Sequence, residues 1–247
     1  MTGMLASVTS VAEASTVLNN AVDIIDLKQP SQGALGALTT DIVAAVVNVI
    51  NDVVPTSATI GDVDPNDPGL LETICQMSET GVDIVKVGLF ETRPTDYFID
   101  AISKTVEKNI NLVIVLFAEN YIGNDSYKPL LQTGIKGIML DTKDKSSKNL
   151  REILCNNELE DFIKTTRSAG LLTGLAGSLR FSDIENLLKL KPDYLGFRGA
   201  LCSDNNRVNR IDSFKIKKIR NAIPQDSNIN YDLRKSEQEV LKNGTVA

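Results

Sequence analysis

Short runs of β-forming residues alternate along the chain with longer segments in which apolar residues recur at helical spacing. The predicted strands cover residues 4–9, 23–28, 58–61, 83–89, 111–117, 137–142, 171–176 and 194–199. The predicted helices cover residues 11–20, 39–52, 68–80, 94–108, 158–168, 181–190 and 205–222, with a shorter helix over 125–133. Eight strands, each followed by a helical segment, predict an α/β protein with the (β/α)8 TIM-barrel fold.

The order of these elements favours one barrel domain over an open, doubly wound sheet. The segment after the first strand reads TSVAEA and lacks the glycines of a dinucleotide-binding turn. We therefore expect a catalytic barrel domain over residues 1–223. The remaining residues, 224–247, are mostly polar and are expected to form a C-terminal extension with a surface helix and a frayed tail.

Composition narrows the classes of function. The chain has 247 residues, a net charge of −6 and no long apolar run, so neither a nucleic-acid surface nor a membrane segment is predicted. No signal peptide is recognisable, and three widely spaced cysteines suit reduced thiols, so we expect a cytoplasmic protein. Because the sequence has no histidine, histidine bases and histidine metal ligands are excluded. A homo-oligomer is compatible with the sequence, which does not fix the oligomeric state.

Three lysines lie where predicted strands end: Lys28 in DIIDLK, Lys86 in DIVKVG, and Lys145 shortly after GIMLDT. Side chains alternate between the two faces of a strand, so Asp26 and Lys28 share one face. The apolar face of a barrel strand packs on the helices, which turns Lys28, Lys86 and Asp141 inward at the C-terminal mouth. One such residue is usually a solvated loop residue or half of an ion pair. Three strands with the same pattern indicate an active site.

A lysine amine can form a Schiff base with a carbonyl substrate, transfer protons or bind phosphate. At its ordinary pKa of about 10.4 it is neutral in only about one molecule in 2,500 at pH 7. Burial and neighbouring cations lower that pKa, and converging lysines provide both conditions. Asp141 is then a proton carrier or the counter-ion of one lysine, and Asp26, beside Lys28, is expected to contact the substrate. The sequence does not decide whether Lys143 or Lys145 enters the site.

Two glycine-rich segments, GLAGSL and GFRGALC, follow the last two predicted strands. Loops at these positions of the barrel often bind phosphate through backbone N–H groups. We expect Gly177, Ser178 and Gly199 to contact a substrate phosphate, and Arg198 to add a cationic group. Glycines that only permit tight turns are the alternative for either segment alone.

Other motifs carry weaker signals. The residues QPSQGALGAL after Lys28 are expected to form a long loop over the barrel mouth. Asp62 and Asp64 could hold a cation, but two carboxylates in a proline-rich loop are more often solvated, so no metal is predicted. Arg93 is a second candidate for a phosphate or subunit contact, and Glu119 is expected to cap the segment that follows it.

Together, DIIDLKQPSQGALGA, DIVKVGLF, GIMLDTKDK, GLAGSL and GFRGALC resemble the (5-formylfuran-3-yl)methyl phosphate synthase family. The resemblance implies a lyase that condenses two molecules of glyceraldehyde 3-phosphate, with loss of phosphate and water. The implied product is 4-(hydroxymethyl)-2-furancarboxaldehyde phosphate, a precursor of methanofuran-type one-carbon cofactors. The resemblance also implies a Schiff base at Lys28, a proton-accepting role for Lys86, and a site role for Asp141 with Lys145. It implies no cofactor.

Other functions stay open at this point. Another Schiff-base aldolase or isomerase of a sugar phosphate would use the same lysine and phosphate loops, so its product would distinguish it. A non-catalytic barrel that binds a phosphosugar and regulates a partner would bind tightly without covalent trapping. A flavin- or nucleotide-binding barrel is disfavoured, because the chain has no tryptophan and is only 5% aromatic.

Overall fold

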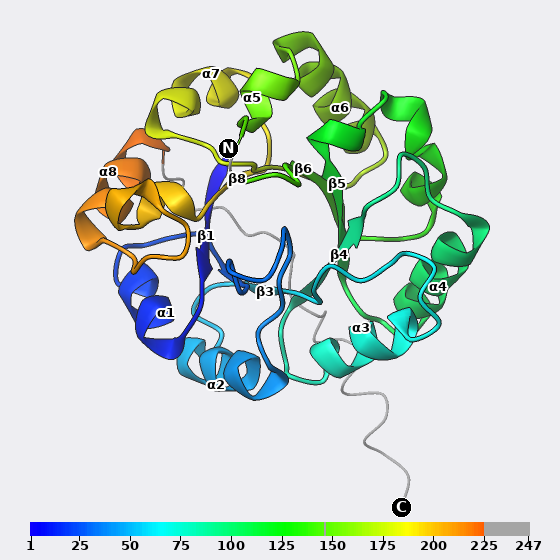
Figure 1. Cartoon of the computed structure of the whole chain (residues 1–247), viewed down its shortest axis with the longest axis horizontal. Helices are drawn as coiled ribbons and strands as arrows, with labels where there is room; N and C mark the ends of the chain where they lie inside the picture. Colours follow the sequence, from blue (N-terminus) through cyan, green and yellow to red (C-terminus); the bar gives the residue numbers. More distant parts are fainter. Residues whose placement is uncertain (146, 225–247) are drawn as a thin grey trace, which may run out of the picture.

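Eight parallel strands close into a barrel in the computed structural model, which describes residues 1–145 and 147–224 (Figure 1). The strands are β1 (Gly3–Val8), β2 (Ile24–Leu27), β3 (Thr56–Thr59), β4 (Ile84–Leu89), β5 (Leu112–Phe117), β6 (Gly137–Asp141), β7 (Leu172–Leu175) and β8 (Tyr194–Phe197). Each strand pairs with the next in sequence, and β1 closes the barrel by pairing with β8. The predicted TIM-barrel fold is confirmed.

Helices form a ring around the outside of the barrel (Figure 1). They are α1 (Val11–Leu18), α2 (Thr40–Ile50), α3 (Leu70–Ser78), α4 (Asp96–Glu107), α5 (Leu150–Ile153), α6 (Asn156–Ser168), α7 (Ile184–Lys189) and α8 (Ser213–Ala222). Short 3-10 turns also occur at η1 (Ala118–Asn120), η2 (Asn124–Ser126), η3 (Lys128–Gln132), η4 (Phe181–Asp183), η5 (Gly199–Leu201) and η6 (Ser203–Asn205). The helix predicted over 125–133 is therefore a pair of 3-10 turns, with a proline at the start of the second.

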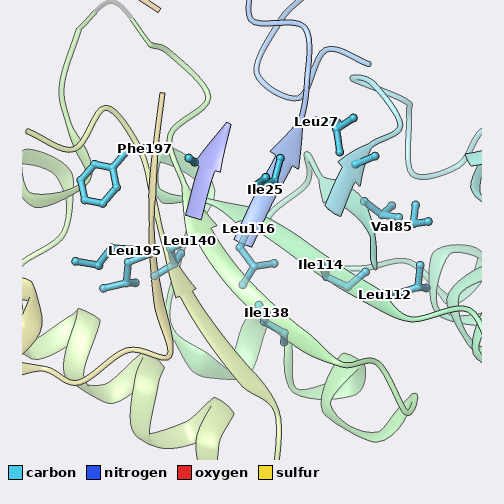
Figure 2. Close-up of a cluster of buried hydrophobic side chains, with 14 of the residues drawn as sticks. Ile25, Leu27, Val85, Leu112, Ile114, Leu116, Ile138, Leu140, Leu195 and Phe197 are labelled. Carbon is cyan, nitrogen blue, oxygen red and sulfur yellow. The ribbon is translucent and has the colours of Figure 1, made fainter. Parts of the chain in front are cut away.

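The apolar residues of the strands divide between two layers because side chains alternate along each strand. One layer packs around the barrel wall, and Figure 2 labels part of it: Ile25, Leu27, Val85, Leu112, Ile114, Leu116, Ile138, Leu140, Leu195 and Phe197. The other layer includes Leu5, Ile24, Ile84, Val113 and Met139 and fills the barrel interior. The predicted alternation in the second and fourth strands is thus confirmed. The inward-facing positions at the C-terminal ends of these strands are occupied by polar side chains.

The third strand and the last helix begin at other residues than predicted. β3 begins at Thr56 instead of residue 58, because polar Thr56 and Ser57 are accommodated inside the sheet, where Ser57 Oγ donates to Asp26 at 2.7 Å. α8 begins at Ser213, well after the predicted start, because the Asp212 carboxylate accepts hydrogen bonds from N–H groups of the first turn.

The C-terminal extension predicted over 224–247 lies outside the described residues, apart from Pro224. Within the part of the chain that the structure describes, no helix has the length and apolar character needed to cross a membrane.

Candidate active site

A cavity of about 1360 Å³ opens at the C-terminal ends of the barrel strands. Its lining includes every residue that the sequence predicts for the site: Asp26, Lys28, Lys86, Asp141, Lys145, Gly177, Ser178, Arg198 and Gly199. These residues come from β2, β4 and β6 and from the segments that follow β2, β6, β7 and β8, which barrel closure brings around one opening (Figure 1). The structure therefore brings the predicted residues together, and their contacts indicate what each one can do.

Lys86 on β4 and Asp26 on β2 form a buried ion pair, with 2.8 Å between Nζ and Oδ1. The hydroxyl groups of Ser7 and Ser57 donate to the same carboxylate at 2.7 Å each. Burial opposes ionisation of Asp26, but Lys86 and then Lys28 outweigh it and lower the pKa of the carboxyl group. Three donors, Ser7, Ser57 and Lys86, bind this fully buried carboxylate. Asp26 is therefore better placed to orient Lys86 than to contact the substrate directly, as the sequence led us to expect.

Lys28 follows β2 directly and is only 6% exposed. Its Nζ lies 4.0 Å from Oδ2 of Asp141, the last residue of β6. Burial lowers the pKa of Lys28 to about 8, and the cations Lys145 and Lys86 act in the same direction, while Asp141 and Asp26 oppose them. At pH 7 about one such amine in ten is neutral, roughly two hundred times the fraction expected at its ordinary pKa. Lys28 is therefore suited to act as a nucleophile near neutral pH.

Asp141 lies near the amines of Lys145 and Lys28, at different distances. Its Oδ1 accepts hydrogen bonds from Lys145 Nζ and, at 2.7 Å, from the backbone N–H of Thr142, while Lys28 lies farther away. Although burial opposes ionisation, Lys145 and Lys28 lower the pKa of Asp141 to about 2. Burial lowers the pKa of Lys145, and Asp141 opposes this shift. The carboxylate thus favours a charged Lys145 while the more distant Lys28 can lose its proton.

Lys143 and Lys145, both in the loop after β6, line the cavity, and their contacts show which of them joins the cluster around Asp141. Lys145 contacts Asp141, whereas Lys143 is exposed and lies 5.8 Å from the centroid of the Phe90 ring. The Glu119 carboxylate accepts hydrogen bonds at 2.8–2.9 Å from the backbone N–H groups of Lys143 and the residue after it. Glu119 therefore fixes this loop in the conformation that turns Lys145 inward.

The loop after β7 requires glycine at Gly177. Its φ is +104°, and a Cβ atom there would lie 2.8 Å from Cγ2 of Thr142. The next residue, Ser178, also has a positive φ of 51°. Among the residues that the structure describes, no hydrogen-bond acceptor is found for the backbone N–H groups of Gly177, Ser178, Gly199 or Ala200, all of which line the cavity. These amides are available to a bound anion.

Arg198 differs from the expectation that its guanidinium binds phosphate. It forms a buried ion pair with Glu13 of α1, with 2.5 Å between Nη1 and Oε2. The guanidinium also donates to the backbone oxygens of Ser7, Arg207 and Asn209 at 2.8–3.1 Å. With the second bond to Glu13, these contacts use all five guanidinium N–H donors. A phosphate would have to displace these partners, so the geometry favours a structural role for Arg198, and direct phosphate binding by this residue stays an untested prediction.

The contacts that fix the loop after β2 were not predicted from the sequence. Leu35 is 1% exposed and packs with the interior apolar layer, so this loop is a fixed part of the mouth. Asp62 accepts hydrogen bonds from the N–H groups of Ala34 and Leu35 at 2.9 and 2.6 Å. Asp62 thus positions this loop. Within residues 1–145 and 147–224, no group of three or more cysteine, aspartate or glutamate side chains is placed to hold a metal ion.

Arg207 was also missed. It lies in the segment between β8 and α8 that the sequence assigned to a helix, which hid its relation to the mouth. Its Nη2 donates to the backbone oxygen of Gly33 at 3.0 Å and so connects this segment to the loop after β2.

The fold and site define a class of protein, a (β/α)8 barrel with a lysine–carboxylate cluster and two glycine-rich loops at its C-terminal mouth. The solved structure of a 3-hexulose-6-phosphate synthase superimposes with a TM-score of 0.62 at 20% identity, covering 90% of this chain and 100% of that chain. A phosphoribosyl anthranilate isomerase from Thermus thermophilus gives 0.62 at 14% identity, covering 90% and 98%. At these identities the similarity shows the fold alone.

The family is shown by closer matches. The family model described as 4-HFC-P synthase matches residues 4–220. The (5-formylfuran-3-yl)methyl phosphate synthase of Methanococcus aeolicus is 34% identical over 218 residues, which cover 83% of this chain and 92% of the relative. The protein of the same name from Methanosarcina mazei is 31% identical over 210 residues, covering 81% and 90%. The chain belongs to the 4-HFC-P synthase family, and the resemblance of its sequence motifs is confirmed.

Proposed function

We propose that this protein is a lyase that condenses two molecules of glyceraldehyde 3-phosphate to 4-(hydroxymethyl)-2-furancarboxaldehyde phosphate through a Schiff base on Lys28. Inorganic phosphate and water are the other products, and the furan would enter methanofuran-type cofactor biosynthesis. The family membership supports this reaction. The observation that carries the mechanism is a buried amine with a pKa of about 8, placed 4.0 Å from an ionised aspartate.

The first step is attack of neutral Lys28 on the aldehyde of one triose phosphate. Loss of water gives an iminium ion, which acidifies the adjacent C–H bond and allows an enamine to form. This enamine expels phosphate from its C3 to give a conjugated iminium ion. The C3 carbon then bonds to C2 of the second triose phosphate, which adds as the enediol formed by removal of its own C2 proton. Asp141 lies close enough to stabilise the iminium cation electrostatically. Ring closure onto the aldehyde of the second triose, loss of two water molecules and hydrolysis of the Schiff base then release the furan aldehyde phosphate from Lys28.

Proton transfer is assigned to the two amine–carboxylate pairs beside Lys28. Lys86, fixed inside the barrel by Asp26, is the proposed proton shuttle: it is charged in this ion pair, so it donates a proton before it accepts one from the substrate. A carboxylate with a pKa of about 2 is a weak base, so Asp141 acts mainly as a counter-ion. It relays a proton only through its hydrogen bond to Lys145, whose amine also neutralises phosphate charge.

One substrate phosphate is assigned to the loops after β7 and β8. Gly177, Ser178, Gly199 and Ala200 line the cavity, and no acceptor is found for their backbone N–H groups among the described residues. Amides of this kind bind anions without a charged side chain. The positive φ angles of Gly177 and Ser178 define the turn that carries the first two of these amides.

The test is incubation of the full chain with glyceraldehyde 3-phosphate, with cyanoborohydride added to half of each sample. The wild-type protein should release the furan aldehyde phosphate and, with cyanoborohydride, carry a reduced adduct that maps to Lys28. Lys28→Ala should form neither. An exposed lysine gives the matched control, and Lys164→Ala should behave as wild type, because Lys164 lies on α6 and pairs with Glu160 outside the cavity. An adduct that persists in Lys28→Ala would disprove the assignment, and an adduct without furan would indicate a different aldolase.

A further inference from the structure

The proposed reaction brings two phosphates into one cavity, and the amides of the loops after β7 and β8 account for one of them. Two phosphate groups repel each other strongly unless each has its own positive partner. A cavity of about 1360 Å³ exceeds the common range of about 300–1,000 Å³ for a single drug-sized ligand. The mouth therefore has room for a second anionic group, which needs hydrogen-bond donors of its own to hold it.

Arg207 is placed as such a donor by its backbone. Arg198 donates from Nε to the backbone oxygen of Arg207 at 2.8 Å and from Nη2 to that of Asn209 at 3.0 Å. Arg198 is itself fixed by its ion pair with Glu13. The residue that the sequence proposed for phosphate binding thus holds the segment that carries Arg207. The Arg207 side chain extends over the mouth to the backbone oxygen of Gly33.

The carboxylates near Arg207 leave its guanidinium group available to bind an anion. Burial lowers the pKa of Arg207, and Asp141 and Asp62 oppose this shift, but neither carboxylate forms an ion pair with Arg207 among the residues that the structure describes. Asp62 accepts from two backbone amides, and Asp141 accepts from Lys145 and a backbone amide. The contact with Gly33 uses one of the five guanidinium N–H groups, and no other hydrogen bond from this guanidinium is found within the described residues. A half-buried arginine with free donors matches the geometry of a phosphate.

We propose that Arg207 binds the phosphate of the second triose phosphate, and that Arg198 is the positioning residue that holds Arg207 over the mouth. This inference rests on the proposed function, since it requires two phosphorylated substrates. The first substrate forms the Schiff base at Lys28 with its phosphate on the backbone amides. The second is held by Arg207, with Lys145 nearby, so that its C2 faces the conjugated iminium ion at Lys28.

The Arg207→Gln variant distinguishes binding of the second triose phosphate from binding of the first. The rate of furan formation is measured against the concentration of glyceraldehyde 3-phosphate, and the rate of cyanoborohydride trapping at Lys28 is measured in parallel. The half-saturating concentration for furan formation should rise about 10- to 100-fold, the effect of losing hydrogen bonds to a charged group. Trapping at Lys28 should stay within about twofold of wild type. Arg207→Lys should retain part of the lost affinity, and millimolar guanidinium should partly restore furan formation in Arg207→Ala.

Arg210→Gln is the matched control, because Arg210 lies in the same segment, is exposed and does not line the cavity. It should leave both rates unchanged. An unchanged concentration dependence in Arg207→Gln would overturn the inference while leaving the proposed function intact. Equal losses of trapping and furan formation would also overturn it, because they would place Arg207 at the first substrate or in the fold. Wild-type protein that forms neither adduct nor furan would refute the proposed function itself.

Discussion

Replacement of Asp141 by asparagine tests the electrostatic basis of the proposed nucleophile. The substitution keeps the size of the side chain and its acceptor oxygen but removes the negative charge 4.0 Å from Lys28 Nζ. Two unit charges at that distance interact by about 4 kcal/mol at an effective dielectric constant of about 20. One pH unit corresponds to about 1.4 kcal/mol. Even if only a third of the interaction is realised, the midpoint of Lys28 deprotonation should fall by about one pH unit from its value of about 8.

The direction of this shift in the Lys28 midpoint follows from the negative charge of Asp141. Asp141 favours the protonated amine, so its removal makes the neutral, nucleophilic form of Lys28 more common at pH 7. We expect the pH profile of cyanoborohydride trapping to rise through about pH 8 in the wild type and at lower pH in Asp141→Asn. Furan formation should nevertheless fall by about 100-fold or more, because the iminium ion loses its counter-ion.

The assay is the initial rate of adduct formation at Lys28 between pH 5 and pH 9, read by mass spectrometry of the intact protein. Asp161→Asn is the control, because Asp161 is an exposed carboxylate on α6 and should leave the profile unchanged. A midpoint in Asp141→Asn that stays near pH 8, or moves to higher pH, would refute the electrostatic coupling between Asp141 and Lys28.

Three further substitutions test the supporting structure. Lys86→Met should lower the free energy of unfolding in urea by about 3–5 kcal/mol at pH 8, because Asp26 becomes a buried carboxylate without its cation. The loss should shrink as the pH falls and Asp26 takes up a proton, since Lys86 is a cause of its lowered pKa. Gly177→Ala should cost about 1–3 kcal/mol through its positive φ and close contact, and should raise the KM for glyceraldehyde 3-phosphate. Arg198→Met should cost about 3 kcal/mol in the same denaturation assay by leaving Glu13 unpaired.

Double substitutions provide the controls for the two ion pairs. Asp26→Asn in the Lys86→Met background, and Glu13→Gln in the Arg198→Met background, should recover most of the lost free energy of unfolding. Additive losses would show that neither pair is coupled. For Gly177, the comparison is Gly170→Ala, where φ is also positive but no atom lies within 4 Å of the added Cβ. Equal effects at the two glycines would mean that the contact with the loop after β6 is unimportant.

The sequence predicted the barrel because strands and helices have different hydrophobic periods, and each period is a local property. The predicted elements were wrong where the local pattern of polar and apolar residues suggests a different structure from the one that tertiary contacts stabilise. Thr56 and Ser57 look like loop residues, yet they begin β3 because the Ser57 hydroxyl meets Asp26 on the neighbouring strand. The segment before Ser213 looks helical, yet Asp212 caps α8 and leaves Arg207 in an irregular segment over the mouth.

The sequence alone determined which residues face the cavity, because alternation along a strand fixes the inward direction of Lys28, Lys86 and Asp141 before any partner is known. Only the tertiary structure decided what each of these groups contacts. The pairing of Lys86 with Asp26 joins residues 60 positions apart, and that of Arg198 with Glu13 joins residues 185 apart. Such contacts depend on strand register and barrel closure, which no local pattern encodes. For that reason the structure selected Lys145 over Lys143, and it replaced Arg198 with Arg207 as the arginine whose donors are free at the mouth.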